Sequence, residues 1–169
     1  YFDVTIVVIG FVFVGRYLET KSKLETGEAI QKLIGLQSKD AIFDVENLSE
    51  ERKLALEKLG YSTSENFEIK IDDVQEGDIL HVKPGTKIPL DGEIIEGSTS
   101  VDESMITGEP IPVDRLTGDR VIGGTINKQG SVRIKVTKVG SKTLLSQIIK
   151  MVDEAQGSRA PIQRLADRI

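Results

Sequence analysis

The amino-acid sequence predicts a mainly β domain with helices on both sides of it. Short runs rich in β-branched residues alternate with Gly, Pro and Asp turns from residue 67 to residue 138, which is typical of a compact all-β module. Apolar residues recur at helical spacing on either side of that stretch, in residues 19–38 and 144–156. Aromatic residues make up only 5% of the chain and Trp is absent, so Val, Ile and Leu must build the core.

The first 18 residues read YFDVTIVVIGFVFVGRYL, with Asp3 and Arg16 as their only charges. A bilayer span needs roughly 20 apolar residues. We therefore expect residues 1–18 to be the end of a transmembrane helix and the chain to be part of a longer membrane protein. The basic residues Arg16, Lys21 and Lys23 place the following segment on the cytoplasmic side. A buried helix or strand of a soluble domain is the alternative interpretation.

Residues 19–39 are predicted to continue this helix as a stalk. Lys and Glu occupy most positions between apolar residues that recur at roughly helical spacing, namely Leu18, Ala29, Leu33 and Leu36. A short strand is expected next, in residues 41–45.

A charged insert follows in residues 46–68. Ser49 is expected to cap a short helix that runs through Lys58, with Gly60 as its stop. The apolar face of that helix would consist of Leu48, Ala55 and Leu59. A partly ordered loop is the alternative interpretation of the same residues.

Five β-type runs come after the insert and are separated by turn residues. They are FEIKI (67–71), ILHVK (79–83), GEIIEG (92–97), VIGG (121–124) and SVRIKVTK (131–138). A second helix is predicted in residues 144–156, with Leu145, Ile148, Ile149 and Val152 on one side. Residues 160–169 are amphipathic and are expected at the membrane surface.

Composition excludes several kinds of site. The chain has 22 basic and 27 acidic residues and a net charge of −5, which argues against a nucleic-acid partner. Without Cys it has no thiol nucleophile, disulfide or Cys-type zinc site. Its single His, His81, rules out a two-histidine metal site and is interpreted as a strand residue. Any catalysis must therefore use carboxylates, hydroxyls, lysines or backbone amides.

The densest candidate site is VDESMITGEPIP, in residues 101–112. Gly108 allows a positive φ and a close approach by another surface, and Pro110 restricts Glu109 to extended backbone. We expect these residues to hold Glu109 on a stiff, protruding tip, where an exposed carboxylate suits the positioning of a water molecule on a partner surface. A charged hairpin turn without chemistry is the alternative. The adjacent Asp102 and Glu103 would face opposite ways in a strand and do not predict a paired-carboxylate site.

Four long motifs occur in a fixed order: PGTKIPLDGEIIEG (84–97), VDESMITGEP (101–110), GDRVIGGTINKQG (118–130) and AQGSRAPIQRLAD (155–167). Together they resemble the P-type cation-transporting ATPases over nearly the whole chain, apart from the insert. GRYLE (15–19), TGEP and APIQRLAD are similar to the heavy-metal class, and most similar to its monovalent copper exporters.

This resemblance implies a distorted β jelly roll, the actuator domain, in residues 40–145, with a helical arm in residues 146–169 that leads to the next membrane segment. In this family the glutamate of a TGE loop positions the water that hydrolyses an aspartyl phosphate on another domain. The resemblance therefore implies Glu109 as the catalytic carboxylate, together with Thr107 and Gly108. It also implies that the loop's movement is coupled to opening of the ion path, and that the partners are the membrane and the phosphorylation and nucleotide-binding domains of the same protein.

Other parts of the family pattern are missing from this sequence. The chain has no DKTGT motif to be phosphorylated, and no Cys for a Cys-Pro-Cys ion site. ATP, Mg²⁺ and the transported Cu⁺ are therefore expected to bind to domains outside it, and the chain alone is expected to be inactive. Two alternatives stay open: the same role in a zinc, cadmium or other metal pump, and a membrane-tethered β interaction module without chemistry.

Overall fold

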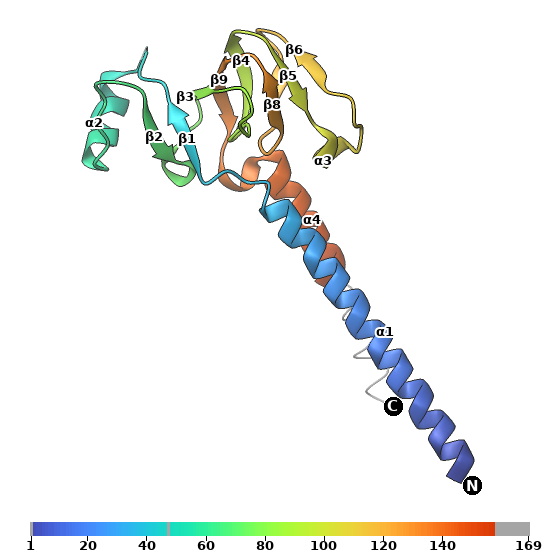
Figure 1. The fold of residues 1–169 in the computed structure, drawn as a ribbon. Coiled ribbons are helices and arrows are strands. Elements are labelled where there is room, and N and C mark those ends of the chain that lie inside the picture. Colours follow the sequence, from blue (N-terminus) through green and yellow to red (C-terminus); the bar gives the residue numbers. More distant parts are fainter. Residues whose placement is uncertain (1, 47, 158–169) are drawn as a thin grey trace. The chain divides into compact units, whose positions relative to one another are not determined.

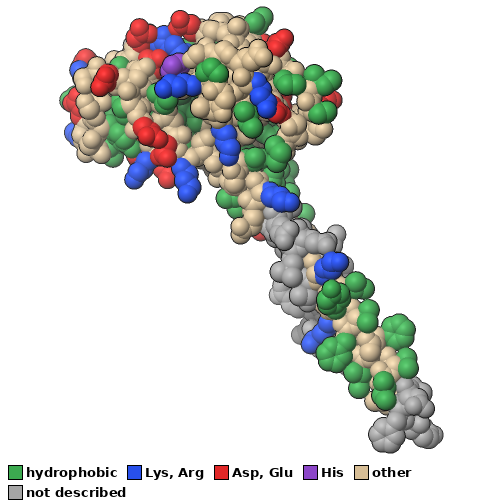
Figure 2. Space-filling model, in the orientation of Figure 1, with side chains coloured by type: hydrophobic (Ala, Val, Ile, Leu, Met, Phe, Trp, Pro, Cys, Tyr) green, Lys and Arg blue, Asp and Glu red, His purple; other side chains and the backbone are tan. Residues whose placement is uncertain are grey.

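The computed structural model describes residues 2–46 and 48–157 and forms two compact units. The first unit, residues 1–35, contains helix α1 (Phe2–Ile34). Large apolar side chains are exposed all along residues 6–18 of this helix, and Figure 2 shows many of them as green groups along it. Among the described residues, no helix is both long enough and apolar enough to cross a membrane.

The second unit begins at Leu36 and contains two antiparallel sheets (Figure 1). The larger sheet has six strands in the spatial order β2-β1-β3-β9-β4-β7. Their bounds are β1 (Asp40–Phe43), β2 (Phe67–Lys70), β3 (Ile79–Val82), β4 (Asp91–Glu96), β7 (Arg120–Val121) and β9 (Val132–Lys138). The five β-type runs of the sequence each supply a strand of this sheet, and the predicted strand near residue 41 is β1.

A smaller sheet of three strands completes the domain, in the order β6-β5-β8. Its strands are β5 (Thr99–Asp102), β6 (Val113–Arg115) and β8 (Ile126–Gln129), and none of them is among the predicted runs. Val101 of this sheet lies in the same buried cluster as Ile94 and Ile134 of the larger sheet. The two sheets therefore share one aliphatic core, and the prediction of a mainly β fold with flanking helices is confirmed.

The insert contains the predicted short helix, α2 (Glu50–Lys58). The Ser49 hydroxyl accepts a hydrogen bond from the Arg52 amide, and Gly60 follows the helix with φ +92°, so both predicted ends are confirmed. The predicted apolar face is partly wrong. Leu56 is fully buried against the core, whereas Leu59 is 56% exposed, because the helix turns Leu56 and not Leu59 toward the sheet.

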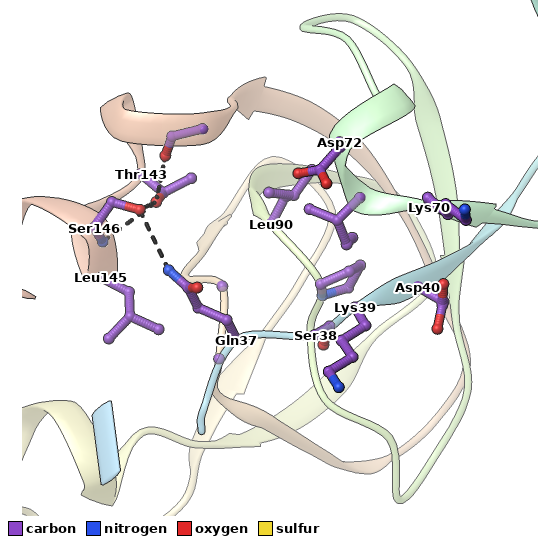
Figure 3. Close-up of a pocket in the computed structure, with 15 residues that line it drawn as sticks. Gln37, Ser38, Lys39, Asp40, Lys70, Asp72, Leu90, Thr143, Leu145 and Ser146 are labelled. Carbon is purple, nitrogen blue, oxygen red and sulfur yellow. Dashed lines mark hydrogen bonds between the residues drawn. The ribbon is translucent and has the colours of Figure 1, made fainter. Parts of the chain in front are cut away.

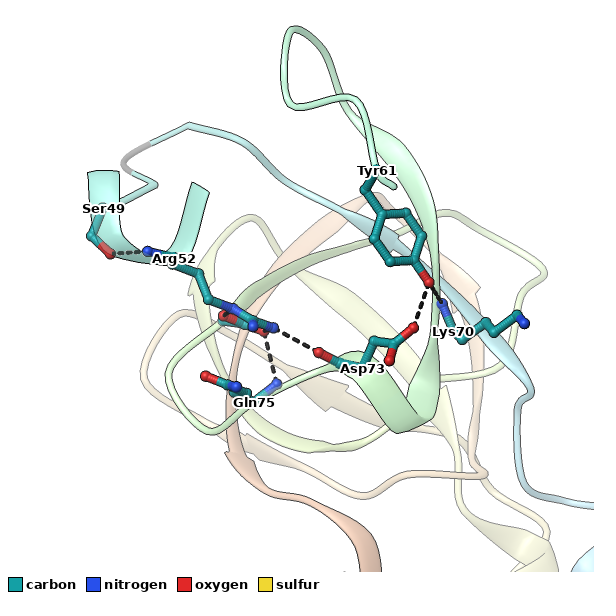
Figure 4. Close-up of polar contacts among 7 residues, drawn as sticks. Ser49, Arg52, Tyr61, Lys70, Asp73 and Gln75 are labelled. Carbon is teal, nitrogen blue, oxygen red and sulfur yellow. Dashed lines mark hydrogen bonds and ion pairs between the residues drawn. The ribbon is translucent and has the colours of Figure 1, made fainter. Parts of the chain in front are cut away.

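Polar contacts also attach the insert to the sheet (Figure 4). The Arg52 guanidinium donates to both carboxylate oxygens of Asp78, at 3.0 and 2.6 Å, and to the Asp73 carbonyl. The Tyr61 hydroxyl donates to the Asp73 carboxylate at 2.6 Å, and this bond raises the pKa of Tyr61. The described part of the insert is therefore anchored to the domain, and the loop interpretation is wrong for α2.

Helix α4 (Leu144–Gly157) follows the short 3-10 helix η2 (Gly140–Lys142). The buried Asp91 carboxylate joins its first turn to the sheet, since it accepts hydrogen bonds from the Leu144 amide at 2.7 Å and the Gly123 amide at 2.8 Å. Leu145 is buried on the predicted apolar side of α4. The amphipathic segment expected in residues 160–169 lies outside the described residues.

Candidate functional site

The segment between β5 and β6 carries Glu109 at the end of the second unit that lies away from α2 (Figure 1). It starts with a single helical turn, α3 (Ser104–Thr107). The chain is then exposed without interruption from residue 107 to residue 114. The structure therefore places Glu109 on a projecting, solvent-exposed loop, as the sequence predicts.

Gly108 ends α3 in the left-handed conformation, with φ +78°. Its amide donates to the Ser104 carbonyl at 2.9 Å, which satisfies a carbonyl that the helix end would leave unpaired. A Cβ built at Gly108 would meet no atom within 4 Å. The backbone conformation therefore favours glycine here, while the space around it stays open to another surface.

Thr107 links the helical turn to Glu109 through its hydroxyl group. Thr107 Oγ1 donates to the Glu103 carbonyl at 3.1 Å and accepts a hydrogen bond from the Glu109 amide at 3.2 Å. The main chain of Glu109 is therefore held by Thr107. The Glu109 carboxylate makes no hydrogen bond or ion pair within the part of the chain that the structure describes.

The two other acidic residues of the segment have structural partners. Glu103 is buried, and its Oε1 accepts from Arg115 Nη2 at 2.7 Å and from Arg115 Nε at 3.2 Å. Asp102 accepts hydrogen bonds from the Ser104 hydroxyl and amide, at 2.6 and 3.1 Å, and pairs with Lys128 at 3.1 Å. The Ser104 hydroxyl contributes most to lowering the pKa of Asp102 to about 2, with help from the Ser104 amide and Lys128.

This arrangement divides three neighbouring carboxylates into two classes. Asp102 and Glu103 hold the base of the loop, and Glu109 is presented to solvent at its tip. Chemically, an exposed carboxylate on an anchored loop can accept a proton or orient a water molecule on a surface brought to it. The sequence located Glu109, Thr107 and Gly108 but missed Arg115. The only sequence feature that points to Arg115 is its positive charge, opposite to that of Glu103, at the other end of the loop.

Two other polar side chains outside the loop, His81 and Thr143, have structural partners. His81 lies in β3, and its Nε2 is 2.6 Å from the Ser131 hydroxyl. Thr143 caps α4, since its hydroxyl accepts from the Ser146 amide at 3.4 Å. In the described ranges, no three His, Asp or Glu side chains form a group able to hold a metal ion.

A half-open cavity of about 570 Å³ lies in the second unit, at the start of α4 (Figure 3). Its wall combines the segment from Gln37 to Asp40 with Leu90, Thr143 and Ser146. At the α4 side of the cavity, Gln37 Nε2 donates to Ser146 Oγ at 3.4 Å, and Thr143 Oγ1 donates to the same hydroxyl at 2.8 Å. Thr107, Gly108 and Glu109 do not line this cavity, so the exposed loop and the cavity are separate features of the second unit.

Comparisons with known proteins identify the family of the chain. The family model described as the P-type ATPase actuator domain matches residues 58–153, more than half of the chain. A copper-exporting P-type ATPase of Staphylococcus saprophyticus is 48% identical over all 169 residues, which cover 19% of its length. Copper-transporting ATPase 2 of Rhizobium meliloti is 46% identical, with 18% of its length covered. The chain thus spans about a fifth of the length of these relatives.

Solved structures show the same fold. A crystal structure of a zinc-transporting PIB-type ATPase matches with a TM-score of 0.64 and 30% identity, over 82% of this chain and 20% of that one. A second crystal structure of a zinc-transporting PIB-type ATPase, in a different state, matches with a TM-score of 0.58 and 28% identity, over 85% of this chain and 21% of that one. From the fold, the loop and these matches together, the chain belongs to the actuator-domain family of the P-type ATPases.

Proposed function

We propose that Glu109 is the catalytic carboxylate that hydrolyses an aspartyl phosphate formed on another domain of the full-length ATPase. A water oxygen attacks the phosphorus atom, and the bond between phosphorus and the aspartate oxygen breaks. The Glu109 carboxylate orients this water and accepts its proton, and inorganic phosphate leaves. Phosphoryl transfer depends mostly on positioning and on charge stabilisation, so one oriented carboxylate is a sufficient contribution from this domain.

The observation that carries this proposal is the state of Glu109 itself. Its carboxylate is exposed and has no partner among the described residues, while Asp102 and Glu103 beside it are both paired. A carboxylate that only held the loop together would be paired within the loop, as Asp102 and Glu103 are. A carboxylate that acts on a second domain must be accessible from outside, and the open space beside Gly108 allows that approach.

We further propose that the full-length protein exports monovalent copper. The relatives named as copper-exporting or copper-transporting ATPases are 41–48% identical to this chain, whereas the zinc-transporting structures are 28–30% identical. ATP, Mg²⁺ and the ion would bind outside this chain. Comparing stimulation of the ATPase by Cu⁺ and by Zn²⁺ in the full-length protein distinguishes copper export from the alternative of a zinc or cadmium pump.

The flanking segments fit the same proposal. Residues 40–145 would form the moving actuator domain, residues 146–169 its second arm, and residues 19–39 the stalk. The apolar side chains exposed along residues 6–18 of α1 suit the end of a membrane helix. The domain would then lie in the cytoplasm, with the phosphorylation and nucleotide-binding domains of the same chain as its partners.

The test is the decay of the phosphoenzyme in the full-length protein. Glu109→Ala is expected to form phosphoenzyme from ATP as the wild type does and to lose it about a hundredfold more slowly, within the range that removal of a general base produces. Asp114→Ala is the matched control, because Asp114 is an exposed carboxylate at the base of the same loop. Wild-type decay in Glu109→Ala would remove Glu109 from the mechanism and favour an interaction module without chemistry.

A further inference from the structure

The loop that carries Glu109 has few attachments of its own. From Glu109 to Pro112 the chain is exposed. Within the described residues, its one main-chain hydrogen bond is the bond from the Glu109 amide to Thr107 Oγ1. A catalytic carboxylate must be held within a fraction of an ångström of its working position. The rigidity of the tip must therefore come from the base of the loop.

Glu103 holds that base in two ways. Its carbonyl oxygen accepts from the Ile106 amide and the Thr107 amide, both at 2.9 Å, and from Thr107 Oγ1 at 3.1 Å. Its carboxylate, with 8% of the side chain exposed, binds the guanidinium of Arg115 on the returning strand β6. Glu103 thus joins the outgoing and returning halves of the loop.

These contacts form one continuous chain from Arg115 to the tip. Arg115 binds the Glu103 carboxylate, Glu103 binds Thr107, and Thr107 binds the Glu109 amide. The Arg115 side chain is 28% exposed and directs two N–H groups at one oxygen, Glu103 Oε1. The adjacent pair of Asp102 and Lys128 is more open, with Lys128 46% exposed.

We propose that Arg115 is a positioning residue for the hydrolysis, acting on Glu109 through Glu103 and Thr107. This inference rests on the proposed function of Glu109. Loss of the Arg115 contact frees the two halves of the loop to separate and leaves the Glu103 carboxylate buried without its cation. The Glu109 carboxylate then samples positions from which the water is not aligned. Dephosphorylation slows, while phosphorylation by ATP, which does not use this loop, continues.

The experiment measures formation and decay of phosphoenzyme in the full-length protein. Arg115→Ala is expected to slow decay about tenfold, less than the hundredfold that a displacement of about 1 Å produces in other enzymes. Arg115→Lys keeps the positive charge but replaces the two fixed N–H donors with a flexible ammonium group. It is expected to recover part of the wild-type decay rate. Formation of phosphoenzyme is expected at the wild-type rate in both variants.

Two further variants separate positioning from general stability. Arg52→Ala removes a part-buried ion pair of the same kind, between α2 and Asp78 just before β3, away from the loop. It is expected to lower the unfolding temperature without slowing decay. Glu109→Ala with Arg115→Ala is expected to decay no more slowly than Glu109→Ala alone, because Arg115 acts only through Glu109.

The outcomes distinguish this inference from the proposed function. If Glu109→Ala slows decay but Arg115→Ala does not, or if Arg52→Ala slows it equally, the positioning role is wrong and the function of Glu109 stands. If Glu109→Ala has no effect, the proposed function itself is wrong. Should Arg115→Ala fail to fold, Arg115→Met keeps an unbranched side chain but removes both donors, and wild-type decay in that variant overturns the inference.

Discussion

At the scale of single residues, the loop between β5 and β6 shows how neighbouring carboxylates acquire different tasks. Asp102 has three donors around it, Glu103 binds a guanidinium, and Glu109 has no described partner. Hydrogen bonds and cations favour the ionised form of a carboxyl group. The contacts of Asp102 therefore contribute to folding stability only while its carboxyl group is ionised.

Asp102 gives a prediction for the pH dependence of stability. Its pKa is lowered from 3.8 to about 2 in the folded chain, chiefly by the Ser104 hydroxyl. A lowered pKa stabilises the fold above the unfolded-state value, and this contribution disappears as the pH falls through the folded-state value. The difference in unfolding temperature between wild type and Asp102→Asn should be constant above about pH 4 and should shrink between about pH 4 and about pH 2.

Ser104→Ala is the control for this titration, because it removes the largest cause of the lowered pKa. In Ser104→Ala, the pH range over which the stabilising contribution of Asp102 disappears should shift upward, toward 3.8. Thermal unfolding followed by circular dichroism from about pH 6 to about pH 2 measures all three proteins. A wild-type advantage that persists unchanged at the acid end of this range would show that Asp102 does not titrate in this way.

The sequence revealed Glu109 and Gly108 but not Arg115, and the reason is physical. The tip depends on local backbone preferences of consecutive residues, Gly108 and Pro110 above all, and such preferences can be read from the sequence. The partner of Glu103, Arg115, lies on strand β6 at the far end of the loop. The number of residues between Glu103 and Arg115 is set by the length of the loop, and no periodic pattern in the sequence marks Arg115.

At the scale of elements, predictability followed the strength of the apolar pattern. The strands of the larger sheet contain Ile, Val and Leu runs, and all were predicted. The strands β5 (TSVD), β6 (VDR) and β8 (INKQ) are short and largely polar. They exist because they pair with one another and bury Val101 and Asn127. Tertiary pairing of this kind overrides weak local propensity.

Leu56, within α2, and Leu59, directly after it, give a prediction about how α2 packs on the sheet. Leu56 is fully buried in the core, and Leu59 is 56% exposed. Leu56→Ala is expected to lower the free energy of unfolding by about 3 kcal/mol through lost burial and an unfilled cavity. Leu59→Ala is the matched control and is expected to change it by less than about 0.5 kcal/mol. Denaturant unfolding measures both, and equal losses would show that α2 does not pack on the sheet through Leu56.

At the scale of the whole molecule, the chain consists of two units that join between residues 35 and 36. The aliphatic core lies entirely in the second unit, in both sheets and in α2. Because a domain with its own core can fold alone, the second unit is expected to fold without α1.

Deletion of residues 1–35 tests this expectation. The shortened chain should keep a cooperative thermal transition and the far-ultraviolet circular dichroism of a β-rich protein. Deletion of residues 1–45 is the control, since it also removes β1, which lies between β2 and β3 in the larger sheet. That longer deletion should abolish the transition. A gradual, non-cooperative melt after the shorter deletion would show that the second unit depends on α1.

The unpaired carboxylate of Glu109 has a consequence for repeated turnover. Under the proposed function, no hydrogen bond of Glu109's carboxylate to the described residues has to break when this side chain meets its target, and none has to re-form when it leaves. The cost that remains on the Glu109 side is removal of the water bound to its carboxylate, which is substantial for a charged group. Under the proposed function, the domain therefore breaks and re-forms no bond of its own described residues in each cycle, and the rate of docking and release depends on the segments that move it.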